Sequence, residues 1–225
     1  MKLALFDIDG TLMDSQAMIL ASMTAAFTAE GLPLPSRPEM LGVVGLSLVK
    51  AMSVLCPQHE HARHESLAQA YKQAFWSYRT DGSFPEVPFD GALDLLRALK
   101  SRDDVLIGIA TGKSQRGVRH IIDQFGLEGV FSTIQTSDDA PSKPHPGMIL
   151  QAMDECGVAP QNTVMIGDAV FDIDMAHAAG VRSIAVAWGF QPLEPLERAK
   201  PNAIVNDFNE LERTLAALWE ERVPA

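Results

Sequence analysis

The stretch LALFDIDGT (residues 3–11) places two carboxylates, Asp7 and Asp9, directly behind an apolar run. Residues two apart on an extended strand point to the same side, so we expect the two carboxylates to share a face. Gly10 then permits a sharp turn. One interpretation is a β-hairpin with an Asp-Gly turn, but residues 14–27, which would supply the second strand, have a helical pattern. The other is a buried strand that delivers both carboxylates to its carboxyl end.

Three later apolar runs resemble the first, at residues 105–110, 163–167 and 182–188. They are continuously apolar rather than alternating, which is typical of parallel strands covered on both faces. Helical patterns lie between them, at residues 94–100, 114–126 and 146–157, and the last two end on glycine. The alternation predicts an α/β fold with an open, doubly wound, mostly parallel sheet.

The segment between the first strand and the others has helical patterns and no convincing strand. We expect a helix with Ile19, Met23 and Phe27 on one face, a second over residues 39–55 and a third over 59–79. The exit, GSFPEVPF, is rich in glycine and proline and is typical of a hinge. The prediction is therefore an α/β catalytic core made of residues 1–14 and 88–225, with a helical cap over residues 15–87.

Composition excludes several classes of protein. The 225 residues carry a formal net charge of −11, which repels nucleic acid. No apolar run approaches the roughly 20 residues of a membrane span, and the first run is too short for a secretory signal. Cys56 and Cys156 lack metal-ligand spacing and are expected to be free thiols. We expect a cytoplasmic protein with no membrane or nucleic-acid partner.

A second acidic segment, GDAVFDID (residues 167–174), follows the apolar run TVMI. Asp168 lies at a strand end, and Asp172 faces the same way if the chain turns helical there. Close carboxylates repel, so a hard cation such as Mg²⁺ between them is one interpretation. The other is an acidic helix N-terminus favoured by the helix dipole. Asp174 is expected to be solvated surface.

Two further segments offer groups for an anion. TGKS (residues 111–114) lacks the glycine that a P-loop requires, but Thr111 could hold an anion with the nearby N–H groups, or cap a helix. Lys143 lies in the proline-rich loop PSKPHP, where it is either ordinary surface or a fixed cation. His145 beside it is expected to be loop surface.

Asp7, Thr111 and Asp168 each follow a predicted strand, and ligands of doubly wound sheets bind at the carboxyl ends of strands. Carboxylates, a hydroxyl, Lys143 and an implied cation on one edge suit phosphoryl transfer. The histidine-rich stretch QHEHARHE (residues 58–65) lacks a metal-binding spacing and is expected to be a solvated helix face.

These motifs, in this order, resemble those of the haloacid dehalogenase-like hydrolases. DIDGT matches their DxDxT motif, and Thr111, Lys143 and the GDxxxD of residues 167–172 match the following three. The helical insert resembles their C1-type cap. GDAVFDIDMAHAAGV (residues 167–181) and the later WGF (residues 188–190) resemble the phosphoglycolate phosphatase branch.

The resemblance implies a role for each residue. Asp7 would be the nucleophile and Asp9 the general acid and base. Thr111, Gly112 and Lys143 would hold the phosphoryl group. Mg²⁺ would be bound by Asp7, the carbonyl of Asp9 and Asp168, with Asp172 orienting Lys143 or a metal-bound water. Gly112 and Ala169 stand where many relatives have asparagine and a hydroxyl residue.

The main hypothesis is a Mg²⁺-dependent phosphatase for a small phosphorylated metabolite, with phosphoglycolate as the first candidate. Asp9 favours phosphate chemistry over halide displacement, because the founding dehalogenases lack the second aspartate of the motif. A β-phosphoglucomutase-like phosphotransferase is an alternative, although residues 41–50 of the cap offer no arginine for a sugar phosphate. A non-enzymatic phospho-switch similar to receiver domains is the alternative from a different class, and the long insert argues against it.

Overall fold

The computed structural model describes residues 1–220, and this part of the chain contains one six-stranded sheet with the order β5-β4-β1-β6-β7-β8. Every neighbouring pair is parallel. The strands are β1 (Lys2–Phe6), β4 (Val105–Ala110), β5 (Thr133–Gln135), β6 (Thr163–Gly167), β7 (Arg182–Val186) and β8 (Ala203–Val205). The chain extends the sheet from β1 through β4 to β5, and then crosses to β6 on the other side of β1. Ligand sites of open α/β sheets lie at such a reversal of strand order.

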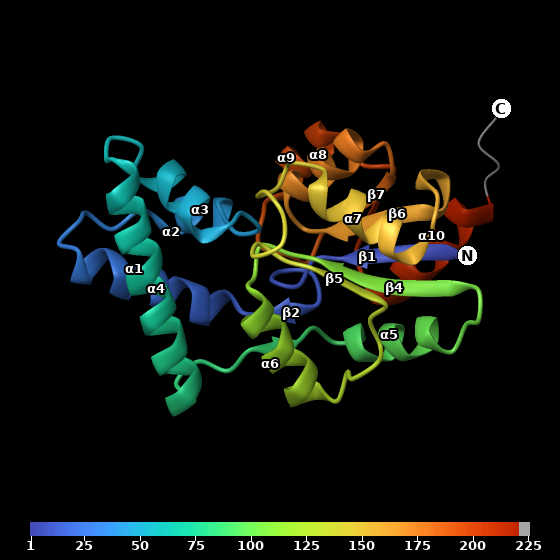
Figure 1. Cartoon of the computed structure of the whole chain (residues 1–225), viewed down its shortest axis with the longest axis horizontal. Coiled ribbons are helices and arrows are strands. Elements are labelled where there is room, and N and C mark those ends of the chain that lie inside the picture. Colours follow the sequence, from blue (N-terminus) through green and yellow to red (C-terminus); the bar gives the residue numbers. More distant parts are fainter. Residues whose placement is uncertain (221–225) are drawn as a thin grey trace.

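Helices cover both faces of the sheet (Figure 1). One face packs on α5 (Ala92–Lys100), α6 (Gln115–Phe125) and α10 (Phe208–Glu220), and the other on α7 (Gly147–Cys156), α8 (Val170–Ala179) and α9 (Leu193–Ala199). A 3₁₀ turn, η1 (Pro160–Asn162), precedes β6. Ala4 and Phe6 of β1 face the first layer, and Leu3 and Leu5 face the second. The strands are continuously apolar because both of their faces are buried. The sequence pattern predicted this arrangement.

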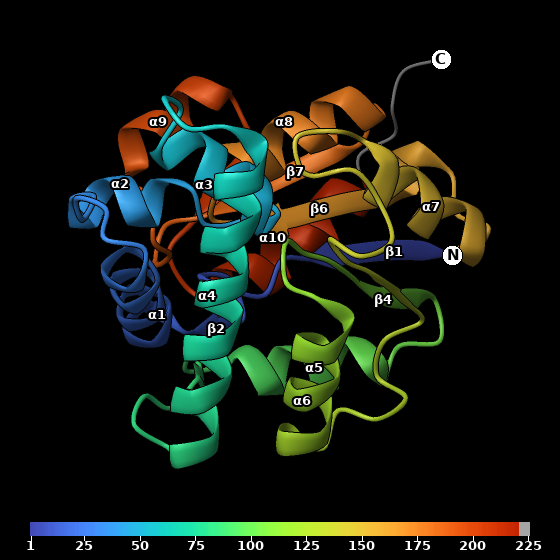
Figure 2. The ribbon, with the colours of Figure 1, turned by 60° about the vertical axis from the view of Figure 1, so that its left-hand side comes forward.

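Between β1 and β4 the chain forms a helical unit beside the carboxyl ends of the strands (Figures 1 and 2). It consists of α1 (Gln16–Ala29), α2 (Arg37–Gly42), α3 (Leu48–Leu55) and α4 (His61–Asp81). Its own hydrophobic core includes Met23, Phe27, Met52 and Leu67. Two short antiparallel strands, β2 (Met13–Asp14) and β3 (Val87–Pro88), join the segments that enter and leave this unit. We call α1–α4 and their loops the cap.

Several predicted elements differ from the structure. The helix expected over residues 39–55 is wrong as a single element, because α2 and α3 are separated by a loop, residues 43–47. Gly45 in this loop has φ = +100°, which no continuous helix accommodates. The short strands β5 and β8 were not predicted, since three residues give too little periodicity. Within residues 1–220, no helix has both the length and the apolar character needed to cross a bilayer.

Candidate active site

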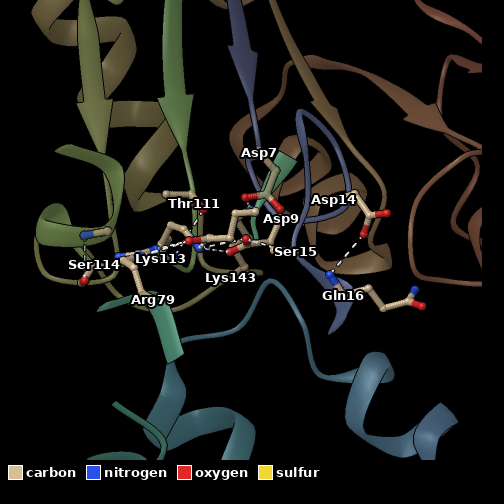
Figure 3. Close-up of polar contacts among 12 residues, drawn as sticks. Asp7, Asp9, Asp14, Ser15, Gln16, Arg79, Thr111, Lys113, Ser114 and Lys143 are labelled. Atoms are coloured by element: carbon tan, nitrogen blue, oxygen red, sulfur yellow. Dashed lines mark hydrogen bonds and ion pairs between the residues drawn. The ribbon is translucent and has the colours of Figure 1, made fainter. Parts of the chain in front are cut away.

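Asp7, Thr111 and Asp168 directly follow three adjacent strands, β1, β4 and β6. The sheet register pairs Phe6 with Ile109 of β4 and Ile166 of β6, so the three strand ends are nearly level. Figure 3 shows Asp7 and Thr111 at this edge, near Lys143. Lys143 comes from the loop before α7. The expected convergence at the carboxyl edge is therefore present in the structure.

A tight turn places Asp9 beside this edge. β1 ends at Phe6, and the N–H of Met13 donates to the carbonyl of Ile8 at 2.9 Å. Gly10 has φ = +87°, and a Cβ atom there would lie 2.2 Å from Oδ2 of Asp168. Only glycine fits this close approach. Asp7 and Asp9 line the same pocket, although β2 pairs with β3 and not with β1, so no hairpin forms.

Four buried side chains form the first charged group of the site, which we call the carboxylate cluster: Asp7, Asp168, Asp172 and Lys143. One ligand oxygen from each of the three carboxylates lies within 4.8 Å of the others. Lys143 lies between two of them, with Nζ 2.6 Å from Oδ1 of Asp172 and 3.0 Å from Oδ1 of Asp7. All four side chains are at most 2% exposed, so Lys143 is not the surface lysine that its loop alone suggested.

Asp168 and Asp172 are also fixed by neutral donors. The hydroxyl of Thr11 donates to Oδ1 of Asp168 at 3.0 Å, and the N–H of Phe190 donates to Oδ2 at 2.8 Å. The N–H of Ala169 donates to Oδ2 of Asp172 at 3.1 Å at the start of α8. Asp172 therefore lies at the helix N-terminus, as one of the two interpretations expected, and it also binds Lys143. Asp174 is exposed, as expected.

The electrostatics of the carboxylate cluster favour a bound cation. Burial, followed by repulsion from Asp7 and Asp172, raises the pKa of Asp168 to about 8. Burial alone would lower the pKa of Lys143, but the carboxylates of Asp172 and Asp7 outweigh it and raise the pKa. Within residues 1–220, Asp7 has no hydrogen-bond partner for either oxygen apart from its ion pair with Lys143. Three carboxylates against one ammonium, with free oxygen ligands, fit a hard divalent cation.

A second charged group connects Asp9 to the cap, and we call it the hinge ion-pair chain: Asp9, Lys113, Glu86 and Arg79. Nζ of Lys113 lies 2.9 and 3.0 Å from the two carboxylate oxygens of Asp9 and 3.1 Å from Oε1 of Glu86. Arg79, near the end of α4, donates from Nε to Oε2 of Glu86 at 3.0 Å. Figure 3 shows Lys113 between Asp9 and Arg79. The hydroxyl of Ser15 also donates to Asp9, at 2.6 Å.

The hinge ion-pair chain is electrically balanced. Burial alone would raise the pKa of Glu86, but Lys113 and Arg79 outweigh it and lower the pKa. Burial alone would lower the pKa of Lys113, whereas Asp9 and Glu86 raise it. Sequence reasoning missed Lys113 and Glu86 as site residues. The position of Lys113, two residues after Thr111, could have indicated that it belongs to the site. Glu86 lies in the glycine- and proline-rich stretch, whose composition indicated only a hinge.

A pocket of about 400 Å³ between the cap and the core is lined by Asp7 from the carboxylate cluster and by three members of the hinge ion-pair chain, Asp9, Lys113 and Arg79. The cap loop, residues 43–47, closes over it: the N–H of Ser47 donates to the hydroxyl of Ser142 at 2.9 Å. Gly112 lies directly under this loop, and a Cβ atom there would be 2.5 Å from the carbonyl oxygen of Gly45. The absence of a side chain at Gly112 therefore allows the cap loop to contact the turn after β4.

The remaining candidate residues have simpler surroundings. Thr111 is buried, and its hydroxyl accepts a hydrogen bond from the N–H of Lys113 at 3.3 Å. His61 is exposed, but His64 is buried with Nε2 3.0 Å from the carbonyl of Cys56, so the expected solvated face is wrong for His64. Cys56 and Cys156 are free thiols.

Known proteins with similar sequences identify the family of this chain. The profile of the haloacid dehalogenase-like hydrolases matches residues 4–186, and the chain belongs to this family. A phosphoglycolate phosphatase from Xylella fastidiosa is 32% identical over 86% of this chain and 83% of its own length. Pyrophosphatase PpaX from Oceanobacillus iheyensis is 30% identical over 92% and 93%, respectively. The chain is an enzyme of the phosphatase type.

Solved structures share the fold. The crystal structure of a predicted phosphatase from Clostridium acetobutylicum superimposes with a TM-score of 0.84 at 26% identity. The match covers 96% of this chain and 98% of that one, so it includes the cap as well as the sheet.

Proposed function

We propose that this phosphatase hydrolyses a small phosphorylated metabolite in a Mg²⁺-dependent reaction through an aspartyl-phosphate on Asp7. The observation that carries the proposal is the buried Asp7 carboxylate, which borders the pocket and has Lys143 3.0 Å away as its ion-pair partner. A carboxylate that is ordered by the fold and not occupied by neutral donors is available as a nucleophile.

In the first step, an oxygen of Asp7 attacks phosphorus while the bond from phosphorus to the leaving oxygen breaks. Asp9 in its protonated form gives its proton to that oxygen, so the product leaves as a neutral alcohol. In the second step, Asp9 as a carboxylate takes a proton from water, and the resulting hydroxide attacks phosphorus. The bond to Asp7 breaks, phosphate is released, and both aspartates return to their starting forms.

Thr111, the backbone of Gly112 and Lys143 would hold the oxygens of the transferred phosphoryl group. Thr111 and Lys143 come from neighbouring segments at the strand ends and are both about 1% exposed. Their donors are thus fixed before the substrate arrives, which is the condition for electrostatic stabilisation of a transition state. Asp172, 2.6 Å from Nζ of Lys143, would keep that ammonium in position.

Asp7, Asp168, Asp172 and the carbonyl of Asp9 would hold Mg²⁺, because the carboxylate cluster has an excess of negative charge and oxygen ligands of the type this ion prefers. A bound Mg²⁺ would supply charge neutralisation for the phosphoryl oxygens. Asp168, whose oxygens are oriented by Thr11 and Phe190, would present a fixed ligand.

Phosphoglycolate is the first candidate substrate, in view of the relative from Xylella fastidiosa, and pyrophosphate is the second, in view of PpaX. The cap would select the leaving group, since its loop and α4 line the pocket beyond Asp9. Initial rates over a panel of phosphate esters, pyrophosphate and sugar phosphates would separate these candidates. Isomerisation of β-glucose 1-phosphate faster than phosphate release would favour a mutase instead.

The chemical proposal is tested with 4-nitrophenyl phosphate and the Asp7→Asn variant. We expect turnover that requires Mg²⁺ and falls by about 10⁴-fold or more in the variant. Asp174→Asn is the matched control, because it makes the same change at an exposed aspartate that does not line the pocket. Equal activity of Asp7→Asn and the wild type would refute Asp7 as the nucleophile.

A further inference from the structure

The pocket is lined by more cationic than anionic side chains, in a protein with a net charge of −11. Its lining includes four cationic side chains, Lys72, Arg79, Lys113 and Arg116, and three carboxylates, Asp7, Asp9 and Asp138. The carboxylate cluster already provides Lys143 for the phosphoryl group. These four cations lie on α4, in the turn after β4 and at the start of α6, where the leaving group of a substrate would lie.

Lys113 differs from the other three cations in its position. Arg79 is committed to Glu86, the guanidinium of Arg116 lies 3.5 Å from the ring centre of Trp76, and Lys72 is exposed on α4. The side chain of Lys113 is only 8% exposed and contacts the proposed general acid Asp9 through both carboxylate oxygens. An anion in the pocket beside Asp9 would therefore meet the ammonium of Lys113.

The surroundings of Lys113 allow its ammonium to exchange partners. The ammonium has three N–H donors on a flexible stem, and in the structure they serve Asp9 and Glu86. Asp9 keeps the hydroxyl of Ser15 at 2.6 Å if Lys113 moves away. Glu86, held by Arg79, remains as a fixed counter-charge that keeps Lys113 at the pocket wall.

We propose that Lys113 selects substrates whose leaving group carries its own negative charge, a carboxylate or a second phosphate, by moving from Asp9 to that anion. This inference rests on the proposed function and names the substrate class for the same site. With a neutral leaving group, Lys113 stays on both oxygens of Asp9, and Asp9 is not free to meet the leaving oxygen. With an anionic one, the substrate takes the place of Asp9 as the partner of Lys113.

The test compares two pairs of substrates at fixed free Mg²⁺. In the first pair, phosphoglycolate carries a carboxylate, and 2-hydroxyethyl phosphate has a neutral hydroxymethyl group in its place. In the second, pyrophosphate carries the second phosphate, and methyl phosphate has a neutral leaving group. The quantity measured is the ratio of kcat/KM for the charged and neutral members, before and after Lys113→Met.

We expect Lys113→Met to reduce this ratio by roughly 10- to 100-fold in at least one pair, the loss of one charge-assisted contact. The pair with the larger change tells whether the anion is a carboxylate or a phosphate. The variant Lys113→Met/Glu86→Gln also removes the charge of Glu86, which Lys113 had partly neutralised, and it should show the same loss. Lys50→Met, which removes an exposed cation of the cap outside the pocket lining, should keep the wild-type ratio.

A ratio that Lys113→Met leaves unchanged in both pairs would overturn the inference, and so would an equal loss in Lys50→Met, which would indicate only long-range electrostatics. Mg²⁺-dependent hydrolysis by the wild type of 4-nitrophenyl phosphate or of either charged substrate separates failure of the proposed function from failure of the selection by Lys113. If no such activity is present, the proposed function fails. If it is present while the ratios do not depend on Lys113, only the selection by Lys113 fails.

Discussion

The carboxylate cluster and the hinge ion-pair chain both contribute residues to the same pocket, but they differ in charge balance and in the elements that they connect. The cluster combines three carboxylates with one ammonium, and all four side chains are buried. The chain combines two carboxylates with two cations and extends from the turn after β1 to α4 of the cap. Asp7 belongs to the first group and Asp9 to the second, although they are two residues apart.

This difference connects structure to function. An excess of buried negative charge is unfavourable in the protein alone and is relieved by a cation, so the cluster is suited to metal and phosphate. A balanced chain is stable without a ligand, and its members come from the core, the hinge and the cap. The rigid sheet thus orients Asp7, the proposed nucleophile, whereas contacts that involve the cap orient Asp9, the proposed proton donor.

The largest effect is expected from removing the lysine of each group. Lys143→Met leaves the buried carboxylates of Asp7 and Asp172 without their counter-charge and should lower the free energy of unfolding of the metal-free protein by about 3–5 kcal/mol. Lys113→Met leaves Arg79 to pair with Glu86 and should cost about 1–3 kcal/mol. Urea denaturation of both variants measures the difference. Equal losses would show that the two groups do not differ in the way described.

Asp9→Asn should lower turnover by about 10²–10⁴-fold, the usual contribution of a general acid and base. With a substrate that has a good leaving group, the aspartyl-phosphate should accumulate, because its hydrolysis needs Asp9 as a base. Ser15→Ala removes one hydrogen bond to Asp9 and should have a smaller effect in the same direction. Quenched-flow measurement of bound phosphate follows the intermediate, and its absence in Asp9→Asn would contradict the assigned role.

The pH dependence of stability distinguishes the crowded cluster from the balanced chain. Asp168 has a pKa raised from 3.8 to about 8, so the folded protein holds a proton that the unfolded chain has lost. This contribution to the stability of the metal-free protein is complete below about pH 4 and is lost as the pH rises through 8.

Mg²⁺ competes with that proton, so it should raise the Tm more at pH 9 than at pH 6. At saturating Mg²⁺ we expect the Tm to increase by about 5–10 °C. Thermal melts with Mg²⁺ or with a chelator measure how the Tm changes with pH for the metal-bound and the metal-free protein. Asp168→Asn should flatten the slope of the metal-free protein. A Mg²⁺ effect that is equal at both pH values would contradict the raised pKa.

The smallest predicted effect tests the contact between the cap loop and the turn after β4. Gly112→Ala places a Cβ atom 2.5 Å from the carbonyl oxygen of Gly45 and should displace the loop. We expect kcat/KM to fall about 10-fold, as overpacking typically costs 1–3 kcal/mol. Gly42→Ala is the matched control, because nothing lies within 4 Å of a Cβ atom at Gly42. Similar kinetics for both variants would show that the loop tolerates a side chain at position 112.

The sequence predicted the parallel sheet and its helices well, because strands buried on both faces and helices that end on glycine leave strong local patterns. Gly126 and Gly157 do end α6 and α7 in the left-handed conformation. The loop between α2 and α3 was missed, since apolar residues continue through it at helical spacing. Its conformation is defined by Gly45 and by contacts with Gly112 and Ser142, which are distant in sequence.

The candidate site was predictable where residues follow strands. Asp7, Thr111 and Asp168 could be placed at one edge because parallel strands share their carboxyl ends. Lys113 and Glu86 could not be placed in the site, because their ion pair depends on how the hinge packs against the turn after β4. The sequence pattern carries no information about that packing. His64 was misassigned for a similar reason, as its partner is a backbone carbonyl with no sequence signature.

The central claim is that Asp7, and not Asp9, becomes phosphorylated. The most direct measurement is to quench Asp9→Asn during turnover, reduce the acyl phosphate with borohydride, and locate the product by peptide mass spectrometry. The account predicts homoserine at position 7, dependent on substrate and absent from Asp7→Asn/Asp9→Asn. Reduction at another carboxylate, or substrate-dependent labelling that persists without Asp7, would contradict it.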